Sequence, residues 1–201
     1  MSRWFACCCL LMLPMTTRAE PPALPSDKDV PMTTNPFFET WTTPFGLPPF
    51  DRIREEHFLP AIERGIDDQR AEVRAIANRP EPATFDNTLV ALDRTGARLE
   101  QVELVFHNLL GAETTPGLQA IAKKAAPLLA ALEDDIYLDP NLWARVNAVY
   151  QGRDGLKLAF DDLRLLTETR KRFVRGGAAL DAAGKERLRA VHQELSVLGL
   201  R

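Results

Sequence analysis

Cysteine is nearly absent from this 201-residue sequence, and the three that occur, Cys7, Cys8 and Cys9, are adjacent near the N-terminus. They lie inside an apolar run with the features of a leader peptide, so the rest of the chain has no thiol. Without thiols a protein forms neither disulfides nor thiolate metal sites. Attachment of a lipid to one of these cysteines is the weaker alternative, because the leucine that usually stands upstream is missing.

Histidine is also scarce, and its spacing lacks the pattern of a zinc peptidase. Such an enzyme places two histidines one helical turn apart with a glutamate beside the first, so that both rings reach one metal and the carboxylate activates its water. The three histidines here, His57, His107 and His192, have no such neighbours. No spacing supports a metal held jointly by all three, and we interpret each as a surface or packing residue.

Long runs of one charge are missing as well. The formal net charge is −3, which gives no broad attraction to nucleic acid or to an anionic membrane surface, so we exclude both partners. Acidic segments at residues 67–68, 133–135 and 161–162 are interpreted as solvated helix faces, because adjacent residues on a helix do not face each other. A basic cluster of residues 170–172 with Arg175 suits the negative end of a helix dipole. Its functional alternative is a site for a peptide carboxylate or a partner.

The first nineteen residues have the pattern of a secretory signal peptide. Arg3 precedes an apolar run over residues 4–15, and the small residues Thr17 and Ala19 flank a plausible cleavage point. The run is shorter than the roughly 20 residues that span a bilayer, so a permanent anchor is the weaker alternative. We therefore expect a periplasmic or secreted protein with no membrane attachment after cleavage of residues 1–19.

Residues 20–49 are predicted to be a Pro-rich linker that ends as an extended arm. This segment holds eight of the fifteen prolines, and each fixed φ and missing donor disfavours regular structure. The arm carries Phe37, Phe38, Trp41 and Phe45. We expect these aromatics to pack on the helices that follow, or else to remain uncovered where a further part of the protein would lie.

Residues 50–201 are predicted to form an all-α, antiparallel helical bundle. Apolar residues recur at helical spacing in residues 60–77, 85–110, 116–136, 140–150, 156–174 and 182–198. Breaks are expected at the turn 152–155 and at glycines 176 and 177, with a kink at Pro127. Nowhere do apolar and polar residues alternate as a half-buried strand requires. The short connections favour antiparallel packing of neighbouring helices.

The Asn35-Pro36 arm and four spaced motifs carry a family resemblance. The motifs are Pro48-Pro49-Phe50-Asp51, His57-Phe58-Leu59-Pro60-Ala61, Thr84-Phe85-Asp86-Asn87-Thr88 and Phe173-Val174-Arg175-Gly176-Gly177-Ala178. Together they resemble the N-terminal region of the thimet-oligopeptidase family of zinc metallopeptidases, of the peptidyl-dipeptidase and oligopeptidase A type. The resemblance runs from about Asn35 to Ser196.

The resemblance implies that these helices form one wall and the lid of a channel that admits short peptides. In that family the zinc and the catalytic groups belong to a later portion, so no catalytic, cofactor-binding or metal-binding residue is assigned here. Residues 50–201 are therefore expected to be an N-terminal domain truncated before the catalytic domain and inactive alone. Two alternatives stay open, a non-catalytic helical peptide-binding or interaction module and a subunit completed by a separate catalytic half. If the domain is truncated in this way, we expect the last helix to expose Leu188, Val191, Leu195 and Leu198.

Overall fold

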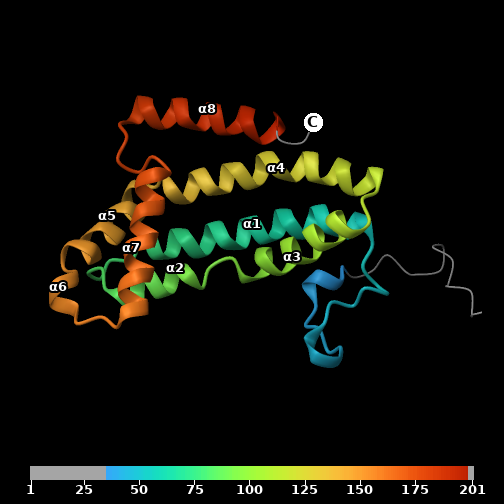
Figure 1. The fold of residues 1–201 in the computed structure, drawn as a ribbon, viewed down its shortest axis with the longest axis horizontal. Helices are drawn as coiled ribbons and strands as arrows, with labels where there is room; N and C mark the ends of the chain where they lie inside the picture. The colour runs from blue at the N-terminus through green and yellow to red at the C-terminus, as the bar shows by residue number, and fades with distance from the viewer. Residues whose placement is uncertain (1–34, 199–201) are drawn as a thin grey trace, which may run out of the picture. The chain divides into compact units, whose positions relative to one another are not determined.

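The computed structural model describes residues 35–198, and every regular element in this range is helical (Figure 1). The longer helices are α1 (Glu55–Ala77), α3 (Ala97–Ala112), α4 (Pro116–Tyr137), α5 (Pro140–Gln151), α7 (Phe160–Arg175) and α8 (Ala182–Leu198). The shorter ones are the 3-10 turns η1 (Pro36–Phe38) and η2 (Pro44–Gly46), the π-helical η3 (Phe85–Val90), α2 (Ala91–Asp93) and α6 (Arg153–Leu156). The predicted all-α bundle is confirmed. The predicted signal peptide and the first part of the linker lie outside the described residues.

Helix α1 packs against α3 on one side and α4 on the other. The ring of Phe58 near the start of α1 contacts that of Phe106 in the second half of α3, with 5.2 Å between centroids, so these helices are antiparallel. Farther along, Arg70 Nε of α1 lies 2.8 Å from Asp135 Oδ2 of α4, while Glu55 contacts Thr115 where α4 begins. Helices α1 and α4 are therefore parallel, because the antiparallel α3 lies between them in the chain.

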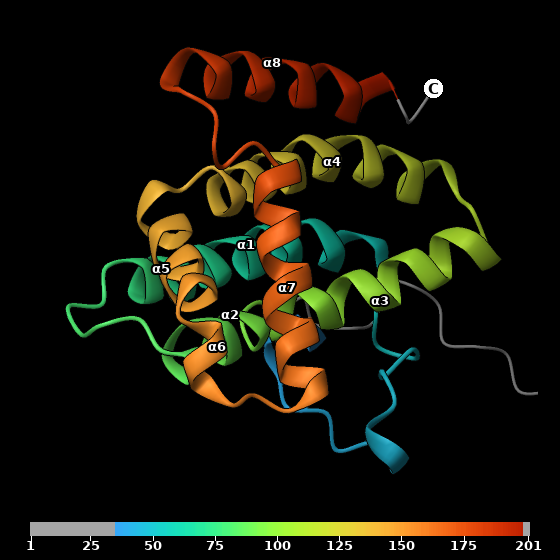
Figure 2. The ribbon, with the colours of Figure 1, turned by 60° about the vertical axis from the view of Figure 1, so that its left-hand side comes forward.

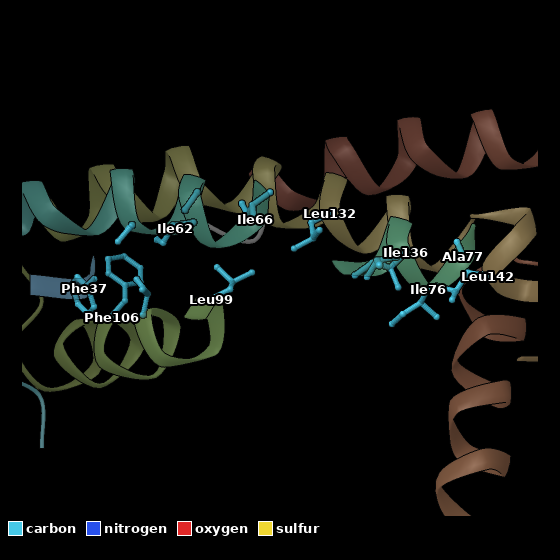
Figure 3. Close-up of a cluster of buried hydrophobic side chains, with 14 of the residues drawn as sticks. Phe37, Ile62, Ile66, Ile76, Ala77, Leu99, Phe106, Leu132, Ile136 and Leu142 are labelled. Atoms are coloured by element: carbon cyan, nitrogen blue, oxygen red, sulfur yellow. The ribbon is translucent and has the colours of Figure 1, made fainter. Parts of the chain in front are cut away.

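The hydrophobic core fills the space between these three helices and continues under α5 and α7 (Figure 3). Its fully buried side chains include Phe58, Ile62, Leu89, Val102, Leu142, Leu166 and Phe173. Gly65 sets the approach of α1 and α3, since a Cβ there would lie 2.9 Å from the Leu99 Cα. Within residues 35–198, no helix is both long and apolar enough to cross a bilayer.

The first long helix begins five residues earlier than its apolar spacing predicts. Helix α1 starts at Glu55, where the Arg54 N–H donates to His57 Nδ1 at 3.0 Å. Pro60 therefore lies in the second turn rather than the first. A proline there removes one backbone hydrogen-bond donor from the helix. The neighbouring residues Phe58, Ala61 and Ile62 are nevertheless buried in the core.

The predicted continuous helix over residues 85–110 is wrong, because the chain breaks at Gly96. A π-helix and the short α2 precede the break, and α3 follows it. Gly96 has φ 77°, a left-handed conformation that glycine adopts without steric cost. Its N–H donates to Glu72 Oε2 at 2.8 Å, so α1 satisfies the backbone at the break. The apolar spacing persists across the break because Leu89 and Leu99 are buried in the same core.

The later segments agree more closely with the sequence. Helix α4 runs through Pro127 as one element, and α5 matches the predicted residues 140–150 to within one residue. The helix predicted from residue 156 begins only at Phe160, because α6 occupies the predicted turn and Lys157 is left-handed with φ 48°. The last helix begins as predicted, with the Gly184 N–H donating to Asp181 Oδ1 at 2.7 Å.

The arm is anchored to the start of α1 by a small aromatic cluster. Phe37 is 2% exposed and packs between Trp41 and Phe58, with its ring centroid 5.2 Å from that of Phe58. Asn35 donates its side-chain amide to the His57 carbonyl at 2.8 Å. Packing is thus confirmed for Phe37 and Trp41, whereas Phe45 is fully exposed at the tip of the arm.

Helix α8 lies antiparallel along α4 and is the outermost helix of the bundle, while α7 crosses the direction of both (Figures 1 and 2). Lys185 Nζ donates to the Leu138 carbonyl at 3.0 Å, just beyond the end of α4. Val191, Leu195 and Leu198 are exposed as predicted. Leu188 is only half-buried, and it faces Gly177.

Candidate functional site

The three histidines lie in three separate surroundings. His57 accepts the Arg54 N–H at the start of α1, His107 contacts the Glu103 carbonyl within α3, and His192 contacts Asp134 across the α4–α8 interface. Among residues 35–198 no group of three histidine, cysteine, aspartate or glutamate side chains lies close enough to hold a metal ion. The donor set that the structure describes therefore does not fit zinc.

The acidic segments divide into surface ion pairs and one buried carboxylate. Asp68 pairs with Arg64 and Arg98, and Asp135 pairs with Arg70, on exposed or partly exposed helix faces. Asp134 is 7% exposed, and its Oδ1 lies 2.6 Å from His192 Nδ1. The interpretation as a solvated face is therefore wrong for Asp134, which instead joins α4 to α8.

The basic cluster also divides. The Arg170 guanidinium lies over the Tyr150 ring at 4.3 Å, and Lys171 Nζ is 2.7 Å from Glu168 Oε1. That hydrogen bond lowers the pKa of the exposed Glu168 carboxyl below its ordinary value. The side chains of Arg172 and Arg175 are exposed and form no hydrogen bond or ion pair with another described residue. The cluster thus offers two available guanidinium groups on α7.

These two arginines border a hollow of about 440 Å³ between α4, α7 and α8. A second hollow of about 480 Å³ runs along α4 between α3 and α8, and a third of about 190 Å³ lies between α1, α2 and α7. Tyr137, in the last turn of α4, lines all three, so the hollows adjoin. We call this combined surface the concave face.

The second hollow has an apolar floor and an acidic rim. Ala126, Leu129 and Leu132 of α4 line it, together with Glu103 of α3 and Glu133 of α4. Burial raises the pKa of Glu103 above its ordinary value, Glu133 and Glu100 raise it further, and His107 offsets part of the rise. Glu133 also lines the first hollow beside Arg172 and Arg175, so carboxylates and guanidinium groups share the concave face.

Sequence reasoning singled out Arg172 and Arg175 but missed Tyr137 and Glu103. Tyr137 is one of only two tyrosines, and it follows the apolar face of α4 by a single residue. Glu103 falls between the buried Val102 and the exposed Leu104, so its position in the sequence indicates only the ordinary boundary between the buried and exposed faces of a helix. No local signal marks either residue, because helices far apart in the chain have to meet before the concave face exists.

Comparison with known proteins shows that this helical chain is similar to one part of several peptidases. It is 41% identical over 167 residues to dipeptidyl carboxypeptidase of Salmonella typhimurium and 39% identical over 166 residues to that of Escherichia coli, covering 83% of this chain in each case. Oligopeptidase A of Escherichia coli is 24% identical over 166 residues. No model of a known protein family matches the chain.

The chain spans about a quarter of the length of the curated relatives it matches, 25% and 24% for the two dipeptidyl carboxypeptidases. Over the matched residues it belongs to the thimet-oligopeptidase family, in the group of dipeptidyl carboxypeptidase and oligopeptidase A. The resemblance drawn from the four motifs is confirmed.

Proposed function

We propose that this chain is a non-catalytic helical part of a zinc metallopeptidase that cleaves short peptides, of the peptidyl-dipeptidase type. The observation that carries the proposal is the 41% identity with a quarter of a dipeptidyl carboxypeptidase, in a chain whose described residues hold no metal-ligand group. Zinc would then be held by residues outside this segment. The parts that bind and align the peptide and the parts that hold the metal would be separate.

The role that this fold supports is that of a wall. Helices α1, α3 and α4 share one continuous core, which makes a rigid support, and α8 and α7 border the concave face on it. A rigid wall restricts the orientations of a bound chain before any bond is broken, which lowers the entropic cost of the reaction. The described residues thus supply shape and charge, not reacting groups.

Two variants of this function remain. The chain can be a subunit that a separate catalytic half completes, or a helical peptide-binding module that works without catalysis. The second variant is favoured by the available Arg172 and Arg175 groups beside an apolar hollow.

We further propose export to the periplasm or the exterior, on the basis of residues 1–19. Sequencing the N-terminus of the protein recovered from the periplasm tests it, and an intact Met1 in the cytoplasm would contradict export.

The main proposal is tested by assaying the purified chain with added zinc on short blocked peptides. Escherichia coli dipeptidyl carboxypeptidase in the same buffer is the positive control. We expect no turnover above the protein-free rate from the chain alone. Turnover that scales with protein concentration and disappears with a chelator would show that the chain is catalytic by itself and would refute the proposal.

A further inference from the structure

Helix α8, the outermost helix in Figures 1 and 2, carries a stripe of apolar side chains along one flank. Leu188, Val191, Leu195 and Leu198 follow one another at intervals of three, four and three residues. This spacing is the a and d pattern of a coiled-coil seam. Val191, Leu195 and Leu198 are 45%, 57% and 52% exposed, and none of the α8 side chains that the structure describes is buried. The seam therefore has no partner among residues 35–198.

The two edges of this seam have different surroundings. Lys185 and His192 occupy its e positions, and both side chains contact α4 or the residue that follows it. Arg187 and Glu194 occupy the g positions on the other edge. Both are exposed, and neither side chain forms a hydrogen bond or ion pair with another described residue. A second helix can therefore approach the seam from its g edge.

The charges on the g edge select the partner and its direction. Arg187 and Glu194 are seven residues apart, so they cannot pair within one helix, whose surface neighbours are three or four apart. In an antiparallel pair of helices, g positions lie beside g positions, and charges there set the orientation. Two antiparallel copies of α8 would place Arg187 of each copy beside Glu194 of the other. In a parallel pair, Arg187 would instead face His192, and no ion pair would form.

We propose that this chain forms a two-fold symmetric dimer through α8, with the two copies of the helix antiparallel. Leu188 of each copy packs against Leu198 of the other, and Val191 packs against Leu195. The partner is a second copy because one stripe and one pair of charges supply both sides of the contact, as an isologous interface requires. None of the four stripe residues lines the three hollows of the concave face, so the dimer is independent of the proposed function.

The size of the seam sets the strength of the dimer. Four apolar side chains from each copy make an interface smaller than the roughly 1,200 Å² at which stable complexes begin. The dimer is therefore weak and exchanges with the monomer, with an expected dissociation constant of about 10–100 μM.

The first test is sedimentation equilibrium of the full chain in reducing buffer, which prevents cross-linking through Cys7, Cys8 and Cys9. Leu195→Ser is expected to weaken association by about tenfold, because the two-fold axis counts each lost contact twice. Leu104→Ser is the matched control, since Leu104 is 59% exposed on α3 and lies outside the seam. A parent chain that stays monomeric to about 500 μM, well above the expected constant, would overturn the proposal. Equal weakening by the two variants would also overturn it.

Charge reversal tests the antiparallel direction. R187E and E194R each bring like charges together twice in the dimer, so each is expected to weaken association by about fivefold. The double variant R187E/E194R recreates both ion pairs and should return to within about twofold of the parent. Circular dichroism reports the folding of each variant. A folded double variant that associates as weakly as the product of the two single effects would contradict the antiparallel pairing.

Mixing the two single variants separates contacts between copies from effects within one helix. A mixed dimer of R187E with E194R has two attractive pairs, whereas each variant alone has only repulsive ones. Native mass spectrometry of the mixture should therefore show more mixed dimer than either homodimer. A statistical mixture of the three dimers would overturn the assignment of Arg187 and Glu194 to the contact.

Discussion

His192 of α8 contacts the buried carboxylate of Asp134 on α4, with 2.6 Å between Nδ1 and Oδ1. Only one other side chain, Lys185, hydrogen-bonds from α8 to the end of α4 within the described residues. The outer face of α8 exposes Val191, Leu195 and Leu198. The His192–Asp134 contact is therefore one of two polar links that join the outermost helix, which borders the concave face, to α4.

Replacing His192 with alanine is expected to lower the free energy of unfolding by about 1–3 kcal/mol, because it leaves a buried carboxylate without its partner. The double variant H192A/D134A should lose less than the sum of the two single variants, since the residues are in contact. Urea denaturation measures both. H107A is the control, because His107 is exposed on α3. Strict additivity would show that the pair contributes no coupling.

Gly96→Ala should destabilise the protein by about 1–2 kcal/mol, because a left-handed conformation is costly for a residue with a Cβ. The new Cβ would also lie 2.5 Å from the Gln69 side chain. Gly111→Ala in α3 is the matched control, with nothing within 4 Å of its Cβ. That change is expected to be neutral or stabilising by up to about 1 kcal/mol, as in other helix interiors. Thermal unfolding of both variants measures the two changes in stability. Equal changes would contradict a left-handed conformation at Gly96.

Arg145 is a buried cation that holds the loop after α1 to α5. It donates to the Arg79 and Glu81 carbonyls at 2.9 Å each and to Asn87 Oδ1 at 2.8 Å. Arg145→Met keeps most of the volume but removes the donor to the Arg79 and Glu81 carbonyls, while Asn87 Oδ1 still accepts from Thr84 and Thr88. We therefore expect a loss of about 2–3 kcal/mol. Arg187→Met on the exposed face of α8 should change stability by less than about 0.5 kcal/mol. A denaturant midpoint unchanged in Arg145→Met would refute the structural role.

Glu103 makes the stability depend on pH in a defined direction. Its pKa is raised in the folded protein, chiefly by burial, so the folded state binds its proton more tightly than the unfolded state. Its contribution is therefore most favourable below the ordinary value of 4.5 and is lost as pH rises through the raised value. E103Q should be more stable than the parent protein at pH 7 by up to about 1 kcal/mol, or a few degrees in Tm. The difference should vanish near pH 4, and a difference independent of pH would contradict this cause.

Much of the fold could be predicted from the sequence, because burial imposes a period on the helices. The prolines at 116 and 140 predict the starts of α4 and α5, and the spacing in residues 60–77 predicts α1 apart from its first five residues, since each signal is local. Gly96 escapes the same reasoning because its conformation depends on Glu72, which lies on another helix. A periodic pattern continues across such a break whenever both flanking segments pack on one core.

The concave face could not be predicted. Asp134 and His192 are 58 positions apart, and the burial that distinguishes Asp134 from Glu133 and Asp135 exists only when α8 covers α4. Tyr137 gains its position in the same way, from the meeting of α4, α7 and α8. The family motifs could be recognised because each is a span of consecutive residues, whereas the concave face is formed by residues far apart in the sequence.

The most direct test of the central claim is a chimera. In Escherichia coli dipeptidyl carboxypeptidase, the stretch that matches this chain is replaced by residues 35–198, and hydrolysis of a short peptide is measured against the parent enzyme. If these residues are a non-catalytic wall of such a peptidase, the chimera should hydrolyse the peptide while the isolated chain does not. A chimera that unfolds cooperatively, like the parent, yet cleaves no peptide would contradict the account.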